Sequence, residues 1–306
     1  MGKTHTAERF DVHQHVTNQI ITAMEAGAGN WQMPWHRSAH ALTRPANIAS
    51  GKAYRGINIL ALWVAAAAND YAHGLWGTYR QWQERGAQVK KGEKSSVIVF
   101  YKELEVARED APTETDKVLF ARASRVFNVA QVDGFTLPAG EDEPQEDRIE
   151  PIDAAEAFTA ATGARIEIGG SMACYRPGND TITMPERRLF IGSETSSATE
   201  AWYSTLLHEL THWSGAKHRL ERDLSGRFGD DAYAMEELIA ELGAAFLCAE
   251  LGITPEPRAD HAAYLAGWLK VMKADKKAVF TAASAASRAA DYLGALEQSE
   301  PQRMAA

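Results

Sequence analysis

One short segment limits the fold of this chain more than any other. Residues 204–220 read STLLHELTHWSGAKHRL, with His208, Glu209 and His212 in the spacing H-E-x-x-H. On a helix, positions i and i+4 share a face, so both imidazoles can be presented to one zinc ion. Glu209 then lies beside the ion, where it can act as general base on a water molecule. Leucines and Trp213 surround the motif, which indicates a mostly buried helix whose polar side chains need partners.

A second apolar segment supplies the carboxylates that such a site requires. Residues 233–252 read YAMEELIAELGAAFLCAELG and predict a helix that bears Glu236, Glu237 and Glu241. Glu237 and Glu241 are one turn apart and face the same way, so we expect Glu237 to be the third metal ligand. Glu241 then supports a ligand histidine, with the exchanged assignment as the alternative, and Glu236 is expected on a solvated face. Three protein ligands leave a fourth position for water, as catalytic zinc requires.

The hydrophobic pattern along the chain predicts an α+β fold in two domains, the second with a small sheet that leads into the H-E-x-x-H helix. The predicted linker is an acidic segment with three prolines, TLPAGEDEPQEDRIEP (136–151), between residues 1–135 and 152–306. In the first domain we expect helices at 9–26, 58–69 and 78–85, and a pair of strands within 95–104 and 117–129. In the second we expect a helix at 154–162, three short strands within 164–185, and helices near 198–215, 231–251, 259–272 and 274–297.

Charge and composition set further limits. Residues 1–102 hold twelve Lys/Arg against six Asp/Glu, a net charge of +6, whereas the rest of the chain carries −15. This contrast favours a first domain that faces an anion. No apolar run is long enough to span a membrane, and Cys174 and Cys248 are the only cysteines, which favours a reducing compartment. We therefore expect a cytoplasmic protein with no membrane partner.

Aromatic residues and cations alternate through the first domain, which holds five of the eight tryptophans. This pattern is typical of single-stranded nucleic-acid binding, because rings stack on bases and cations contact phosphates. The alternative is that the rings form the core and the lysines only keep the surface soluble. The candidate DNA-binding residues are Trp31, Trp35, Arg55, Trp76, Tyr79, Lys90, Lys91 and Lys94.

Taken together, these segments resemble the ArdC family of plasmid antirestriction proteins. The N-terminal domain of that family, also found in TraC-type primases, is similar to this chain in NWQMPWH, YRGINILALW, WGTYRQW and GAQVKKGEKS. Its zincin-like domain is similar in MACYRPGNDTITMP, LLHELTHWSGAKHRL, YAMEELIAELGAAFLCAELG and WLKVMKADKKAVFTAASAASRAADYL. The resemblance implies single-stranded DNA binding, a metallopeptidase fold, and protection of incoming DNA from host restriction during conjugation.

The sequence therefore predicts an antirestriction protein with a zinc peptidase site, for which Mn²⁺ is the alternative ion. Glu209 is expected to activate water against a peptide carbonyl. The protein substrate is unknown, and a host restriction component is one candidate. The rival hypothesis is a non-enzymatic single-stranded-DNA-binding protein whose metal is structural and which shields DNA by occupancy. His218, a rival ligand near the motif, is interpreted as a surface histidine.

Overall fold

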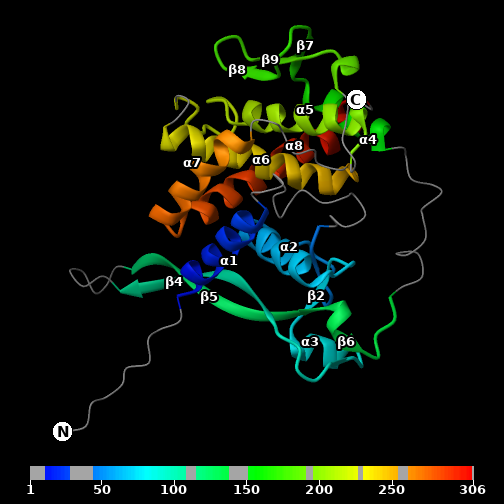
Figure 1. The fold of residues 1–306 in the computed structure, drawn as a ribbon, viewed down its shortest axis with the longest axis vertical. Coiled ribbons are helices and arrows are strands. Elements are labelled where there is room, and N and C mark those ends of the chain that lie inside the picture. The colour runs from blue at the N-terminus through cyan, green and yellow to red at the C-terminus, as the bar shows by residue number, and fades with distance from the viewer. Residues whose placement is uncertain are drawn as a thin grey trace.

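The computed structural model describes residues 11–27, 44–107, 115–137, 151–190, 196–226, 230–253 and 261–304. Its elements are stacked in tiers, with the N-terminal strands at one end, the helices in the middle and a small sheet at the other end (Figure 1). Strands and helices are thus largely segregated, and the predicted α+β class is confirmed.

The N-terminal half is built on one long hairpin. Strand β4 (Ser96–Ala107) pairs over its whole length with residues 115–126 of β5 (Thr115–Asn128), as predicted. Two short strands, β1 (Ala46–Asn47) and β2 (Leu75–Gly77), extend the sheet in the order β1-β2-β5-β4. Helix α2 (Ile57–Asn69) packs on this hairpin, where the buried Asn58 side chain donates to the Val99 carbonyl at 2.9 Å and accepts the Val99 N–H at 2.8 Å. Helix α1 (Val12–Gly27) precedes these elements in the chain.

A second, smaller hydrophobic cluster of this half surrounds Trp82. The Trp82 ring is fully buried and donates its N–H to the Phe127 carbonyl at 3.0 Å. Helix α3 (Tyr79–Glu84) begins with a capping box between Thr78 and Gln81. Strand β3 (Gln88–Val89) pairs antiparallel with β6 (Val132–Asp133), which follows the short helix η2 (Val129–Gln131).

The C-terminal half places a three-stranded sheet against a bundle of helices. The sheet has the order β7-β9-β8, so β8 is an edge strand, and the sheet contacts α5 (Ala198–Ser214) through β8 and β9. All the predicted strands and helices of this half are present, with shifted ends. They are α4 (Pro151–Thr162), β7 (Arg165–Ile168), β8 (Cys174–Arg176), β9 (Thr181–Met184), η3 (Arg187–Leu189), α5 (Ala198–Ser214), α6 (Asp231–Leu251), α7 (His261–Ala274) and α8 (Ala278–Met304).

The two halves share a hydrophobic core, which the sequence did not predict. Trp63 on α2 packs against Phe246 on α6, with ring centroids 5.6 Å apart. The Thr17 hydroxyl donates to the Lys276 carbonyl at 2.7 Å, and α2 contacts α8. Most of the predicted linker, residues 138–150, lies outside the described residues. Within the described part of the chain, no helix combines the length and apolarity that crossing a membrane requires.

Candidate metal centre

Helix α5 carries the H-E-x-x-H motif into the core. It begins at a capping box in which Ser197 and Glu200 satisfy each other's backbone N–H groups, and its apolar side chains are almost all buried. Helix α6 crosses it closely at Gly243, because a Cβ at that position would lie 2.5 Å from the Thr211 methyl carbon. This close approach brings the carboxylates of α6 to the histidines of α5.

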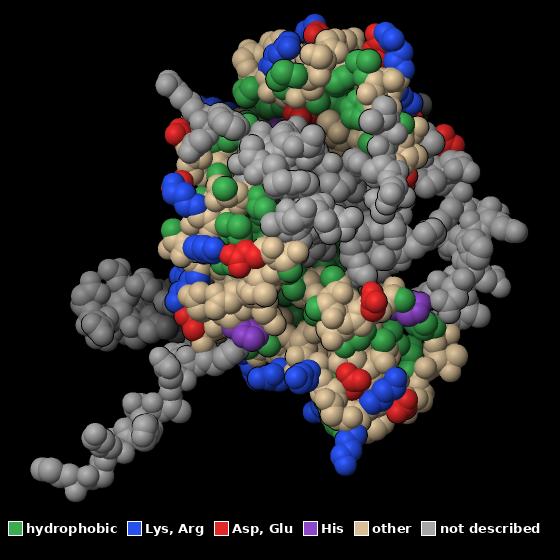
Figure 2. Space-filling view, in the orientation of Figure 1, with side chains coloured by type: hydrophobic (Ala, Val, Ile, Leu, Met, Phe, Trp, Pro, Cys, Tyr) green, Lys and Arg blue, Asp and Glu red, His purple; other side chains and the backbone are tan. Residues whose placement is uncertain are grey.

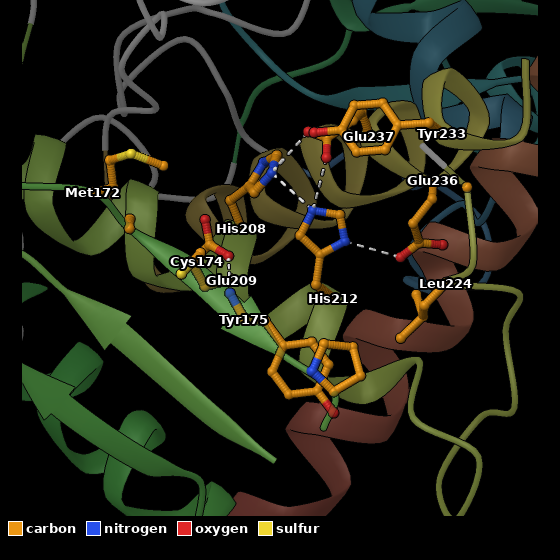
Figure 3. A pocket seen from close by; sticks show the side chains of 13 residues that line it. Met172, Cys174, Tyr175, His208, Glu209, His212, Leu224, Tyr233, Glu236 and Glu237 are labelled. Carbon is orange, nitrogen blue, oxygen red and sulfur yellow. Dashed lines mark hydrogen bonds and ion pairs between the residues drawn. The ribbon is translucent and has the colours of Figure 1, made fainter. Parts of the chain in front are cut away.

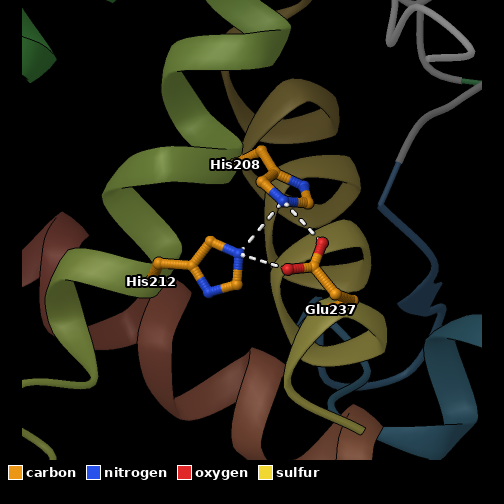
Figure 4. A group of neighbouring side chains, drawn as sticks. All are labelled: His208, His212 and Glu237. Atoms are coloured by element: carbon orange, nitrogen blue, oxygen red, sulfur yellow. Dashed lines mark hydrogen bonds and ion pairs between the residues drawn. The ribbon is translucent and has the colours of Figure 1, made fainter. Parts of the chain in front are cut away.

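Three predicted ligands converge between these helices. The Nε2 atoms of His208 and His212 are 3.1 Å apart, and each lies 3.5 Å from one oxygen of Glu237 (Figure 4). Two imidazole nitrogens bound to one tetrahedral zinc at about 2.0–2.1 Å are separated by about 3.3 Å. The three side chains therefore match the spacing that one small divalent cation requires.

The outer nitrogen of His212 explains why a cation fits there. His212 Nδ1 lies 3.0 Å from Glu236, whereas the buried His208 Nδ1 is 3.7 Å from Glu241 and has no hydrogen-bond partner among the described residues. A carboxylate only accepts hydrogen bonds, so the ring hydrogen of His212 belongs on Nδ1. The His212 Nε2 lone pair then points at His208 Nε2, and a positive charge, from a proton or a metal cation, can lie between the two nitrogens.

In the metal-free protein, a proton supplies that positive charge. Burial lowers the pKa of His212, but hydrogen bonds with Glu236 and Glu237 outweigh burial and raise the pKa to about 10. Burial also opposes ionisation of Glu237, yet His208 and His212 hold its pKa well below the ordinary value. The site is thus strongly biased towards one added positive charge.

Glu236 does not lie on a solvated face, and that prediction is wrong. It is only 7% exposed, and Arg222 donates to both of its oxygens, at 2.9 and 3.0 Å. Arg222 is held in turn by the Thr211 carbonyl at 2.6 Å and the Ser214 hydroxyl at 3.0 Å. Glu236 therefore orients the His212 ring and is not a spare surface charge. A signal was present, because a helix that is apolar on all sides leaves no solvated face.

Glu209 faces the edge strand rather than the carboxylates of α6. Its side chain accepts the backbone N–H of Tyr175 on β8 at 2.8 Å. Both residues line a pocket of about 300 Å³ together with the histidines, Glu236 and Glu237 (Figure 3). Met172, Leu224 and Tyr233 complete much of its wall. The polar side chains at the base of this pocket, which include the candidate metal ligands, are thus accessible to a molecule lying along β8.

A polar brace, which sequence analysis missed, fixes β8 to α5. The Tyr175 hydroxyl donates to Asp180 at 2.9 Å, and Arg219 donates to the other Asp180 oxygen at 2.5 Å. The Arg219 guanidinium lies 3.5 Å from the ring centroid of Trp213. His218, the rival ligand, has a side chain that is 65% exposed and lies 3.5 Å from Asp180, away from the ligand group.

Comparison with known proteins assigns the chain to a family. A family model for the N-terminal domain of the anti-restriction factor ArdC matches residues 10–127, and one for a zincin-like metallopeptidase matches residues 153–285. The crystal structure of the antirestriction ArdC protein from the R388 plasmid, in its metal-free form, is 40% identical with a TM-score of 0.77. It covers 94% of this chain and 98% of that one. The chain belongs to the ArdC antirestriction family.

Other relatives extend this ArdC assignment. The Mn(II)-bound structure of the same ArdC protein has a TM-score of 0.74 at 40% identity, with the same coverage. An uncharacterized protein of Sinorhizobium fredii, y4eC, is 50% identical over 299 residues, which are 96% of this chain and 94% of that protein. Two Escherichia coli DNA primases named TraC are 36% identical over 95% of this chain, which spans only 28% and 20% of their lengths.

The structure divides the candidate DNA-binding residues of the ArdC N-terminal domain into several groups. Trp31 and Trp35 lie outside the described residues. Trp76 is 1% exposed and packs edge-on against Tyr71, so its predicted stacking on a base is wrong. Arg55 forms an ion pair with Asp291 of α8. The other four candidates are Tyr79, on α3, and Lys90, Lys91 and Lys94, in the segment that follows β3.

Tyr79, Lys90 and Lys91 line one surface hollow, and Lys94 is exposed a few residues along the chain. Tyr79 is 44% exposed. Figure 2 shows Lys and Arg side chains interspersed with Asp and Glu over the visible face. The basic character of this half is therefore spread out on that face.

Proposed function

We propose that this ArdC-family chain is a divalent-metal-dependent peptidase. His208, His212 and Glu237 would hold the ion, zinc or manganese, since an ArdC relative carries Mn(II). The observation that carries the proposal is the approach of two imidazole Nε2 atoms to 3.1 Å beside a carboxylate, a donor set suited to such a cation. When bound, the ion polarises a peptide carbonyl and lowers the pKa of water.

The chain's own residues would perform the proton transfers. A peptide lying in the pocket along β8 would bring its carbonyl carbon next to Glu209. Glu209 takes one proton from water as the water oxygen bonds to that carbon. It then delivers the proton to the amide nitrogen as the C–N bond breaks. The Tyr175 N–H orients the carboxylate for both transfers.

Two variants separate this proposal from the rival structural-metal hypothesis. Glu209→Gln should retain bound metal and lose cleavage of an unstructured protein such as casein, because a purely structural site needs no general base. His218→Ala, outside the ligand group, should behave like the parent in both assays. Equal casein cleavage by the parent and Glu209→Gln would rule out this role for Glu209. Absence of cleavage from a metal-loaded parent would favour shielding by occupancy.

A second proposed function is single-stranded DNA binding by the N-terminal half. The observation that favours it is an exposed Tyr79 ring in a hollow that Lys90 and Lys91 also line, because a ring and two cations suit a base and its phosphates. Tyr79→Ala should weaken binding of a thymidine 12-mer about 5- to 150-fold, the equivalent of ~1–3 kcal/mol for one stacked base. Equal binding of duplex and single strand would contradict stacking on unpaired bases.

The biological role that follows is protection of incoming DNA in a bacterial cytoplasm. In this proposal the N-terminal half holds the single strand that enters during conjugation. The peptidase site then cleaves a protein that encounters this strand in the recipient cell. A component of the host restriction system is the candidate substrate. The test compares how strongly restriction reduces DNA transfer into recipients that make the parent protein and into recipients that make Glu209→Gln. If protection depends on cleavage, the Glu209→Gln recipients should restrict the incoming DNA more strongly.

A further inference from the structure

The hollow beside α3 is built to receive a flat, polar molecule. It has a volume of about 520 Å³ and is lined by residues of α3, β3, β5, β6 and the turn after β3. Tyr79 and Phe127 form its aromatic part, edge-on to each other with centroids 6.4 Å apart. Polar groups surround these rings: Gln88, Lys90, Lys91, Glu93 and Asp133.

The hydrogen bonds already made inside the hollow decide what its polar groups can still offer. The Gln88 amide nitrogen donates to the Tyr79 hydroxyl at 2.6 Å and to the Val89 carbonyl at 3.2 Å. Both amide hydrogens are thereby used, so Gln88 offers its oxygen as an acceptor. The Tyr79 oxygen accepts from Gln88, which leaves its own hydrogen to donate.

A second acceptor stands next to the Gln88 oxygen. Gln88 and Asp133 are directly opposite each other in the β3–β6 pair, and both are exposed. Opposite residues of an antiparallel pair have Cβ atoms about 4.5–5.5 Å apart on one face of the ribbon. An ionised Asp133 only accepts hydrogen bonds, so the hollow presents two adjacent acceptors.

Guanine is the base whose edge complements this arrangement. Its N1–H and N2 amino groups are two adjacent donors, and its O6 is an acceptor beside them. Cytosine, adenine and thymine each present at most one donor group on the same edge. Sequence-specific reading of single strands uses such edges on unstacked bases. Lys90 and Lys91 supply positive charge for the adjoining phosphates. The Lys90 ammonium group also donates to the Ala130 carbonyl at 3.0 Å, which holds it at the hollow.

We propose that this hollow binds one guanine of a single DNA strand, stacked on Tyr79, with Asp133 and Gln88 accepting hydrogen bonds from N1 and N2. The inference rests on the proposed single-stranded DNA binding and adds a base preference to it. The hollow belongs to the N-terminal half and does not involve the metal centre.

The test compares thymidine 12-mers that carry one central guanine, adenine, cytosine or hypoxanthine, titrated with the full-length protein by fluorescence anisotropy. The guanine 12-mer should bind about 5- to 150-fold more tightly than the adenine or cytosine 12-mer, as expected for a bidentate base contact. Hypoxanthine, which lacks the N2 amine, should lose part of this preference.

A matched pair of variants identifies the residue responsible. Asp133→Ala should abolish the guanine preference while retaining binding of the all-thymidine 12-mer, because it removes one of the two adjacent acceptors. Glu84→Ala, which removes an exposed carboxylate of α3 paired with Arg80 outside the hollow, should keep the preference. Equal binding of all 12-mers, or a preference that survives Asp133→Ala, would overturn the inference alone. Failure to bind any 12-mer would overturn the DNA-binding function together with it.

Discussion

At the scale of single residues, the orientation of His212 depends on a carboxylate outside the candidate ligand group. Glu236 holds His212 Nδ1 at 3.0 Å and is itself clamped by Arg222. Glu236→Gln should weaken metal binding about 10- to 100-fold, because outer partners of this kind fix the ring that donates to the ion. Competition with a chromophoric chelator measures the change, and Glu209→Gln is the control. Unchanged affinity in Glu236→Gln would mean that His212 needs no support.

The raised pKa of His212 gives the metal site a pH dependence. With a pKa of about 10, this histidine is protonated in the metal-free protein at pH 7.5, and a bound metal must displace that proton. We expect release of about one proton per metal ion, and an affinity that rises as the pH increases towards 10. Calorimetry in buffers of different ionisation enthalpy counts the protons. Binding without proton release would show that His212 is neutral beforehand.

Residue spacing was enough to predict that the two histidines share a helix face, and it was not enough to predict what holds them. His208 and His212 follow from helical periodicity, which is local, whereas Glu237 was inferred because an apolar helix that carries carboxylates needs partners for them. Arg222 reaches Glu236 from a turn outside both helices, and Tyr175 reaches Glu209 from a strand 34 residues earlier. Such contacts exist only in the folded chain, so no local pattern records them.

At the scale of elements, the distance between α5 and α6 depends on one missing side chain. A Cβ at Gly243 would meet Thr211 at 2.5 Å, so Gly243→Ala must push the helices apart. We expect the free energy of unfolding to fall by about 1–3 kcal/mol, as for other overpacked cores, with weaker metal binding. The variant that also carries Thr211→Ala should recover part of both losses, since it removes the clashing atoms. Additive losses in urea unfolding would exclude this contact as the cause.

Element prediction succeeded where a pattern was long and failed where pairing alone makes a strand. The paired strands β4 and β5 and the four C-terminal helices carry periodicity over a dozen residues or more. Strands β1, β2, β3 and β6 have two or three residues each, too few for any alternation to be read. Strand β8 is equally short, but the Gly, Asn and Pro residues around it marked its ends in the sequence. Their partners are fixed by tertiary contacts, such as those around Trp82.

At the scale of the whole molecule, the two halves are joined through the helix that carries the candidate ligand Glu237. Phe246 of α6 meets Trp63 of α2 inside the shared core. Phe246→Ala should cost about 3–5 kcal/mol of unfolding free energy, and it should destabilise both halves together. Tryptophan fluorescence and far-ultraviolet circular dichroism should give coincident unfolding curves. Separate transitions, with only one shifted by the substitution, would mean that the halves fold independently.

The sequence predicted the order of the two family regions but not the hydrophobic core that they share. Charge contrast and an acidic linker describe what faces solvent, whereas the contact between halves is made by apolar side chains that any core would use. Trp63 was expected in a core, and nothing in the sequence says that part of this core belongs to the other half.

The metal content of the purified protein tests the central claim most directly. Mass spectrometry of the element bound per chain should find about one divalent ion in the parent and in His218→Ala. His208→Ala, His212→Ala and Glu237→Ala should each lose it, because two remaining ligands hold such an ion poorly. Thermal unfolding must show that these variants remain folded. Full metal content in the folded His208→Ala and His212→Ala variants would contradict the account, since the ion would then be bound elsewhere.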